Sequence, residues 1–214
     1  MRKTLFSGIA ACLLATAATA AEQSPSVIWT VGQADRSASE FALAPDRFRD
    51  FLANDFGYED KYFLVGHSVP AADFPYVLPG PADTWGGTWP TSGWRTHQVN
   101  ILFGLKEIPS DGTCTLVVDL LDYAKNFLPL VKVSVNTQDA KFQLDAPGLC
   151  VADQRKPNQM EKIVDTLSIT GNLAKATPRR LEIPIRPGVL KAGGNEVTIT
   201  VLEGSWILFD RVSL

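Results

Sequence analysis

The stretch Glu196-Val-Thr-Ile-Thr-Val-Leu-Glu203 alternates apolar and polar residues, so that Val197, Ile199 and Val201 share one face of an extended strand. Two other segments repeat this alternation. Their apolar members are Val99, Ile101, Phe103 and Leu105 in one, and Val131, Val133 and Val135 in the other. Because alternation is typical of half-buried strands, these three segments predict the core of a sheet that has one face in contact with a second layer.

Similar short segments, rich in Val, Ile, Phe and Thr and separated by turn residues, recur along the whole chain. The predicted strands are 27–32, 61–66, 97–105, 114–122, 130–136, 180–185, 196–203 and 205–214. A short helical turn is expected over 46–54, and a long irregular excursion over 151–176. The pattern favours an all-β fold, an antiparallel β-sandwich with one short helix and long loops, over βαβ units.

Residues 1–20 have the form of a secretory signal peptide. Arg2 and Lys3 precede an apolar run over 5–18, which ends at the small-residue site Ala18-Thr-Ala20. Cleavage after Ala20 would leave a single domain over 21–214, in a secreted or periplasmic protein. A lipoprotein signal with Cys12 as the lipid-bearing residue is the alternative, and no later segment is apolar enough to span a membrane.

The charge balance argues against a nucleic-acid partner. The full chain has 20 Lys and Arg against 23 Asp and Glu, a formal net charge of −3. Removing residues 1–20 leaves 18 basic against 23 acidic residues, a charge of −5, and no basic run. Nucleic-acid binding proteins usually carry a basic patch, so this class is excluded.

Cys114 and Cys150 are the two cysteines that follow the predicted signal. In an oxidising compartment an isolated pair of this kind usually forms a disulfide, which would stabilise the fold by roughly 3 to 4 kcal/mol. Two free thiols are the alternative.

Three of the five tryptophans, Trp85, Trp89 and Trp94, lie in a segment rich in Pro and Gly that extends over 73–94. Such a segment predicts a loop. Aromatic rings on a loop either anchor it against the core or present a flat face to a partner such as a sugar ring. Trp85 and Trp89 are predicted to form a sugar-binding platform because Gly86 and Gly87 leave their surroundings open, and Trp94 is predicted to be a buried anchor.

A sugar site also needs polar groups that read hydroxyls beside the platform. Tyr76 is a further candidate for the platform. The predicted hydrogen-bonding groups are His67, Asp83, Arg95 and Asn100. For His67 a purely structural hydrogen bond at the end of a strand is the alternative, and Trp206 is expected to pack between the sheets.

Several short motifs follow one another in an order that resembles a known family. They are Gly32-x-x-Asp35-x-x-x-x-Glu40-Phe41, Tyr62-Phe-Leu-Val-Gly66-His-Ser68, Asp73-Phe-Pro75, Leu190-Lys-Ala-Gly-Gly-Asn195 and the terminal strand over 204–214 that contains Asp210. From about residue 27 to 214 the chain resembles the third, carbohydrate-binding-module-like domain of the family 4 polysaccharide lyases, the rhamnogalacturonan lyases.

This resemblance implies a galactose-binding-like jelly roll, an accessory domain found beside catalytic domains that degrade polysaccharides. Sandwiches of this type often hold a structural calcium between the first and last strands, where Asp35, Glu40 and Asp210 stand in this sequence. The alternative is that these carboxylates accept backbone or Arg hydrogen bonds. The resemblance implies no catalytic residue, because the catalytic domain of these lyases has no counterpart in the sequence.

The expected function is that of a secreted, non-catalytic domain that binds plant-type, pectic polysaccharide or oligosaccharide. No nucleophile elbow, zinc-binding helix motif or phosphate-binding loop is present in the sequence. A catalytic lyase or glycosidase chain is a further expected partner. Two alternatives remain: an interaction domain that docks onto a polysaccharide-degrading enzyme, and a small polysaccharide lyase.

Overall fold

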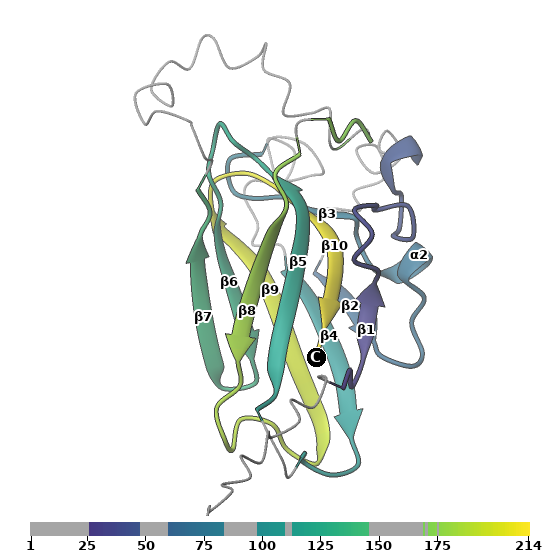
Figure 1. Ribbon diagram of the computed structural model, residues 1–214, viewed down its shortest axis with the longest axis vertical. Helices are drawn as coiled ribbons and strands as arrows, with labels where there is room; N and C mark the ends of the chain where they lie inside the picture. The colour runs from purple at the N-terminus through teal and green to yellow at the C-terminus, as the bar shows by residue number, and fades with distance from the viewer. Residues whose placement is uncertain are drawn as a thin grey trace, which may run out of the picture.

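Two facing five-stranded sheets form the described part of the protein, a β-sandwich (Figure 1). The computed structural model describes residues 26–47, 60–83, 98–109, 113–145, 169, 171–174 and 176–214. The predicted sandwich fold is therefore confirmed.

The first sheet has the order β1-β10-β5-β8, and the short β3 pairs with β10. Its strands are β1 (Thr30–Gly32), β3 (Val77–Leu78), β5 (Thr115–Tyr123), β8 (Arg179–Pro184) and β10 (Ile207–Ser213). The second sheet has the order β2-β4-β9-β6-β7. Its strands are β2 (Lys61–Leu64), β4 (Gln98–Leu105), β6 (Leu130–Val135), β7 (Gln138–Gln143) and β9 (Gly193–Glu203). The described helices are the 3₁₀ turn η1 (Pro45–Arg47) and the one-turn helix α2 (Pro70–Asp73).

One edge of the second sheet departs from the antiparallel pairing that prevails in the rest of the sandwich. β2 pairs with β4 in parallel, with Tyr62 opposite Asn100, whereas the other strand pairs are antiparallel. Parallel neighbours need a long crossover connection, and residues 65–97 supply it. The local sequence does not indicate the parallel pairing, because the direction of a strand depends on the end of the sheet at which its connection enters.

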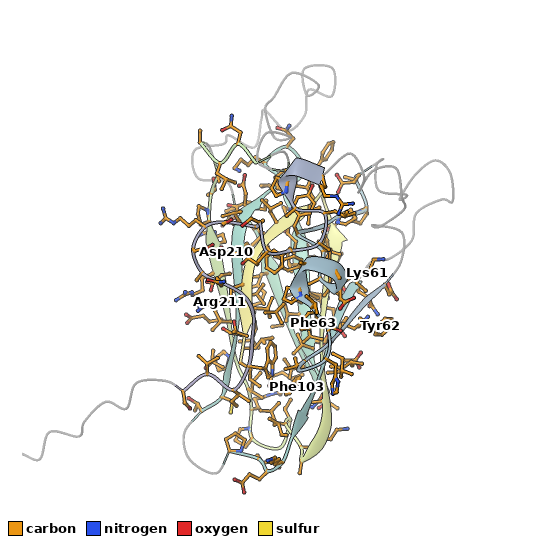
Figure 2. The ribbon with its side chains drawn as sticks, turned by 90° about the vertical axis from the view of Figure 1, so that its right-hand side faces the viewer. Lys61, Tyr62, Phe63, Phe103, Asp210 and Arg211 are labelled. Atoms are coloured by element: carbon orange, nitrogen blue, oxygen red, sulfur yellow. The ribbon has the colours of Figure 1, made fainter. Side chains whose placement is uncertain are left out.

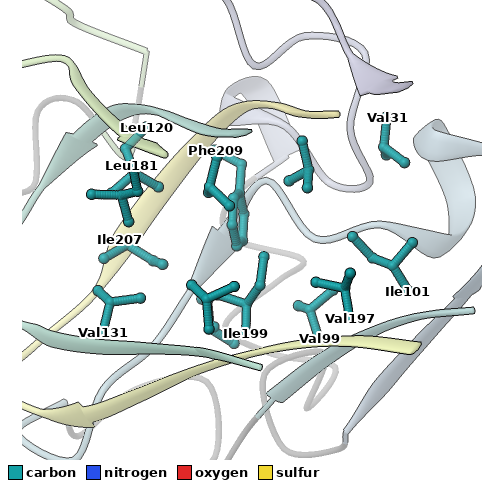
Figure 3. Close-up of a cluster of buried hydrophobic side chains, with 14 of the residues drawn as sticks. Val31, Val99, Ile101, Leu120, Val131, Leu181, Val197, Ile199, Ile207 and Phe209 are labelled. Atoms are coloured by element: carbon teal, nitrogen blue, oxygen red, sulfur yellow. The ribbon is translucent and has the colours of Figure 1, made fainter. Parts of the chain in front are cut away.

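The three alternating segments form the core as predicted. Strand pairing places Val99, Ile199 and Val133 side by side, and each is fully buried. Phe63 on β2 and Phe103 on β4, two neighbouring strands of the second sheet, are buried and point between the sheets (Figure 2). The first sheet contributes Leu120, Leu181, Ile207 and Phe209 to the same cluster (Figure 3). Trp206 is 3% exposed, which confirms that it packs inside the sandwich.

All eight predicted strands are present, with boundaries that shift by a few residues. β7 and β3 were not predicted. β7 lies at the edge of its sheet and alternates around polar residues, so its sequence lacks the apolar signal of a core strand. Of the expected helix over 46–54, the structure describes η1 at its start, and 48–54 lie outside the described residues.

The motifs behind the family resemblance hold turns in place. Glu40 Oε1 accepts the N–H of Gln33 at 2.9 Å, which closes the loop after β1. Asp73 Oδ2 accepts the N–H of Val69 at 2.7 Å at the start of α2. The side chain of Asn195 bonds to the backbone of Lys191 in both directions, at 3.0 and 2.8 Å. These polar residues therefore fix loop geometry through side-chain to backbone hydrogen bonds.

Candidate functional site

Asp83, inside the segment over 73–94 that contains the tryptophans (the tryptophan segment), fixes this segment to the turn between β9 and β10. Its Oδ2 accepts the N–H of Gly80 at 2.8 Å, and the hydroxyl of Ser205 donates to its Oδ1. The neighbouring Ala82 N–H donates to the Gly204 carbonyl at 2.8 Å. Since Asp83 is 6% exposed, its carboxylate serves the loop, with little surface left to read sugar hydroxyls.

The predicted platform residues Trp85 and Trp89, and the predicted hydrogen-bonding Arg95, lie outside the described residues, as does Trp94. Their roles stay predictions. The described chain ends at Asp83 on one side of these residues and resumes at Gln98, the first residue of β4.

Tyr76 belongs to the core, which corrects its predicted place on an exposed platform. Its residue is 0% exposed, and its carbonyl accepts the N–H of Phe209 at 2.9 Å. Burial also raises the pKa of the Tyr76 hydroxyl well above its usual range. A ring without exposed surface cannot stack on a sugar in this conformation.

His67 lies exposed in the turn that follows β2. Its N–H donates to the Leu64 carbonyl at 3.0 Å, and the hydroxyl oxygen of Ser68 accepts the Leu64 N–H at 3.0 Å. These two bonds close the turn, and the role of the His67 side chain stays a prediction.

One register row crosses all five strands of the second sheet on its outer face. Strand pairing aligns Tyr62, Asn100, Thr198, Ser134 and Asp139, which we call the outer-face row. Tyr62 is 59% exposed and lies on the outside of the sandwich, on the side opposite Asp210 (Figure 2). An exposed aromatic ring therefore stands at one end of a polar row.

Hydrogen bonds connect the polar members of this row. The Thr198 hydroxyl donates to Asn100 Oδ1 at 3.0 Å, with Asn100 itself buried. Hydrogen bonds from Ser134 and Lys132 lower the pKa of Asp139, and Lys132 Nζ lies 3.0 Å from Asp139 Oδ2. Because Asn100 is 1% exposed, its amide serves the sheet rather than a ligand. The accessible polar groups in line with the Tyr62 ring are the Thr198 and Ser134 hydroxyls and the Asp139 carboxylate, which are groups that can bind sugar hydroxyls.

Sequence reasoning missed Tyr62 as a surface residue, although the signal was present. Within β2 the alternation places Phe63, which is 4% exposed, in the core and therefore Tyr62 on the opposite face. The sequence prediction used Tyr62 only as part of a motif.

The three carboxylates predicted as calcium ligands each accept backbone hydrogen bonds. Asp35 Oδ1 accepts the N–H of Ser37 at 2.9 Å, and Asp210 Oδ1 accepts the N–H of Arg36 at 3.0 Å. Glu40 is bonded to the loop after β1, as described above. Within the described part of the chain, no group of three or more His, Cys, Asp and Glu side chains is placed to hold a metal. These hydrogen bonds agree with the alternative role of the three carboxylates as backbone acceptors, and the predicted calcium site stays a prediction.

Burial raises the pKa of Asp210 from 3.8 to about 6, and the neighbouring Asp35 and Asp119 add to the effect. The folded protein thus binds more protons than the unfolded chain between these values, so this group makes stability fall as pH rises from about 4 to about 6. We expect Asp210→Asn to remove that part of the pH dependence while keeping an acceptor for the Arg36 N–H. Urea unfolding of both proteins at pH 4, 5, 6 and 7 measures it, and parallel stability curves would contradict the expectation.

Cys114 is half-buried beside the core, and its carbonyl accepts the N–H of Ile185 at 2.8 Å. Cys150 lies outside the described residues, so the predicted disulfide stays a prediction.

The described fold is a carbohydrate-binding-module-like β-sandwich. A family model of the CBM-like domain III of polysaccharide lyase family 4 matches residues 27–214, and the chain belongs to this family. The resemblance drawn from the sequence motifs is confirmed. None of the curated protein sequences compared with the chain matches it.

One similar solved structure is a family GH115 4-O-methyl-α-glucuronidase with specificity for decorated arabinogalactans. The two share 14% identity with a TM-score of 0.32, and the match covers 54% of this chain and 13% of the glucuronidase chain. Among the described residues, no helix has the length and apolar character needed to cross a membrane.

Proposed function

We propose that this protein is a secreted, non-catalytic domain that binds plant-type, pectic polysaccharide. The observation that carries the proposal is the match of residues 27–214 to the CBM-like domain of a polysaccharide lyase family. The signal-like sequence over 1–20 supports export. A catalytic lyase or glycosidase chain would be the natural partner, since domains of this kind accompany such enzymes.

The binding surface we propose combines the tryptophan segment with the outer-face row. After this segment the described chain resumes at Gln98, which is two residues before Asn100 and lies on the same face of β4. Asn100 in turn pairs with Tyr62 on β2. Trp85, Trp89 and Tyr62 would then offer rings to one polysaccharide chain, and the accessible polar members of the row, Thr198, Ser134 and Asp139, would bind its hydroxyls.

Replacing a stacking ring should weaken binding without unfolding the protein. For Trp85→Ala, Trp89→Ala and Tyr62→Ala we expect a loss on the order of 1 to 3 kcal/mol each, about fivefold to more than a hundredfold in Kd. Affinity electrophoresis in gels that contain rhamnogalacturonan, pectin or a neutral galactan measures this loss and shows which glycan is bound.

Two controls make the result specific. Tyr62→Phe keeps the ring and should bind as the parent does. Ile108→Ala removes an apolar side chain that is 50% exposed and lies beyond the far end of β4, and it should also bind as the parent does. Unchanged migration of all three ring variants in every gel that retards the parent would remove the proposed surface. A parent protein that no glycan retards would contradict carbohydrate binding itself.

A further inference from the structure

A pocket of about 300 Å³ opens on the first sheet, away from the outer-face row. Its polar lining comes from four segments that are far apart in sequence: Arg36 after β1, Asp119 on β5, Arg179 and Arg180 on β8, and Asp210 on β10. Its volume lies at the lower end of the range for small-ligand sites. We call it the arginine pocket.

Strand register builds the wall of this pocket. Pairing aligns Gly32, Arg211, Asp119 and Arg180 in one row across β1, β10, β5 and β8. Asp119 Oδ1 accepts Arg180 Nε at 2.7 Å, and Asp119 Oδ2 accepts Arg211 Nε and Nη2 at 2.9 and 2.7 Å. Both oxygens of this buried carboxylate are therefore used by two guanidinium groups.

Several guanidinium donors remain for a ligand. Among the described residues, the Arg36 guanidinium has no hydrogen-bond or ion-pair partner. Arg179 hydrogen-bonds to the hydroxyl of Tyr123, and the side chain of Arg180 is 53% exposed while it holds Asp119. Each guanidinium carries five N–H donors in a fixed plane, so donors exceed the acceptors that the pocket supplies.

The second carboxylate of the pocket is also occupied. Asp210 is 7% exposed and accepts the backbone N–H of Arg36. Asp35 and Glu182 add negative charge nearby but do not line the pocket. The lining thus presents three guanidinium groups against two carboxylates that are already hydrogen-bonded, an arrangement suited to an anion and hostile to a cation.

We propose that the arginine pocket binds the carboxylate of a uronic acid unit in an acidic saccharide. A planar carboxylate matches the fork of a guanidinium, and the pocket has room for one acidic sugar rather than for a long chain. The inference rests on the proposed function for the nature of the ligand, but it uses a different sheet and different residues.

The test compares the parent with Arg36→Gln and Arg179→Gln, which remove charge without removing the arginines that hold Asp119. Lys191→Gln, an exposed cation in the turn before β9, is the matched control. Calorimetric titration uses an oligogalacturonate, a neutral galacto-oligosaccharide and inorganic phosphate at low salt. We expect each arginine variant to weaken oligogalacturonate binding about tenfold, the loss of one charged hydrogen bond, and to leave neutral-sugar binding and the Tm unchanged.

The outcomes separate the two proposals. If both variants bind oligogalacturonate with a Kd within about twofold of the parent's, the arginine pocket is overturned, because losing one charged hydrogen bond should change Kd far more. The proposed function would still stand. Phosphate that binds as tightly as oligogalacturonate makes the pocket a general anion site and overturns its assignment to an acidic saccharide. Two results together support both the proposed function and the arginine pocket. In the titration, only oligogalacturonate binds and its binding depends on the arginines; in the gels, pectin retards the protein and galactan does not.

Discussion

Phe74→Ala is expected to destabilise the protein by about 3 to 5 kcal/mol, a large fraction of the stability of a domain of this size. Phe74 follows α2 and is 0% exposed. Its ring centroid lies 5.3 Å from that of Phe41, 5.7 Å from Phe63 and 5.1 Å from Phe209. One ring therefore joins the loop after β1, the edge strand β2 and the central strand β10, and its removal leaves a cavity among three side chains that are held by separate elements.

Urea unfolding measures this loss, and two further variants locate its cause. Phe127→Ala removes a ring that is 45% exposed and should change stability by less than about 1 kcal/mol. Phe74→Leu keeps most of the apolar volume and should cost about half as much as Phe74→Ala. Equal losses for Phe74→Ala and Phe127→Ala would contradict the central place of Phe74 in the core.

The core was predictable because alternation is a local property. In β4, β6 and β9 each apolar residue at every second position is buried, and one segment of a few residues is enough to reveal this. The family motifs were visible for a related reason: Glu40, Asp73 and Asn195 act on backbone groups within seven residues of themselves.

The candidate surfaces depended on contacts that no local pattern contains. Asp119 meets Arg180 and Arg211 only because β5 pairs with β8 on one side and β10 on the other. Asp210 was assigned a possible metal role from the family resemblance, and its sequence neighbours do not show that it lines a pocket together with Arg36, Arg179 and Arg180. Tyr76 was misplaced for the opposite reason, because a loop-like sequence rich in Pro and Gly conceals the short buried strand β3 that follows it.

The second large effect is expected for Gly32→Ala, which should cost about 2 to 5 kcal/mol. Gly32 ends β1 with φ of +80°, in the left-handed region that disfavours a side chain. A Cβ there would lie 2.4 Å from Cζ of Phe41 and 2.5 Å from the carbonyl oxygen of Asp210. Phe41 is buried and the carbonyl belongs to β10, so neither neighbour can withdraw without moving the core.

Gly188→Ala separates the two parts of this cost. Gly188 has φ of +81°, but no atom lies within 4 Å of the position that a Cβ would take, so only the backbone cost of about 1 to 2 kcal/mol remains. Thermal and urea unfolding of both variants give the difference, which measures the close approach of β1 to β10. Because Gly32 shares a register row with Arg211 and Asp119, its substitution should also weaken oligogalacturonate binding, whereas Gly188→Ala should not. Equal stability losses in the two variants would show that the loop after β1 yields to the new methyl group, and unchanged oligogalacturonate binding by Gly32→Ala would show that the arginine pocket tolerates this movement.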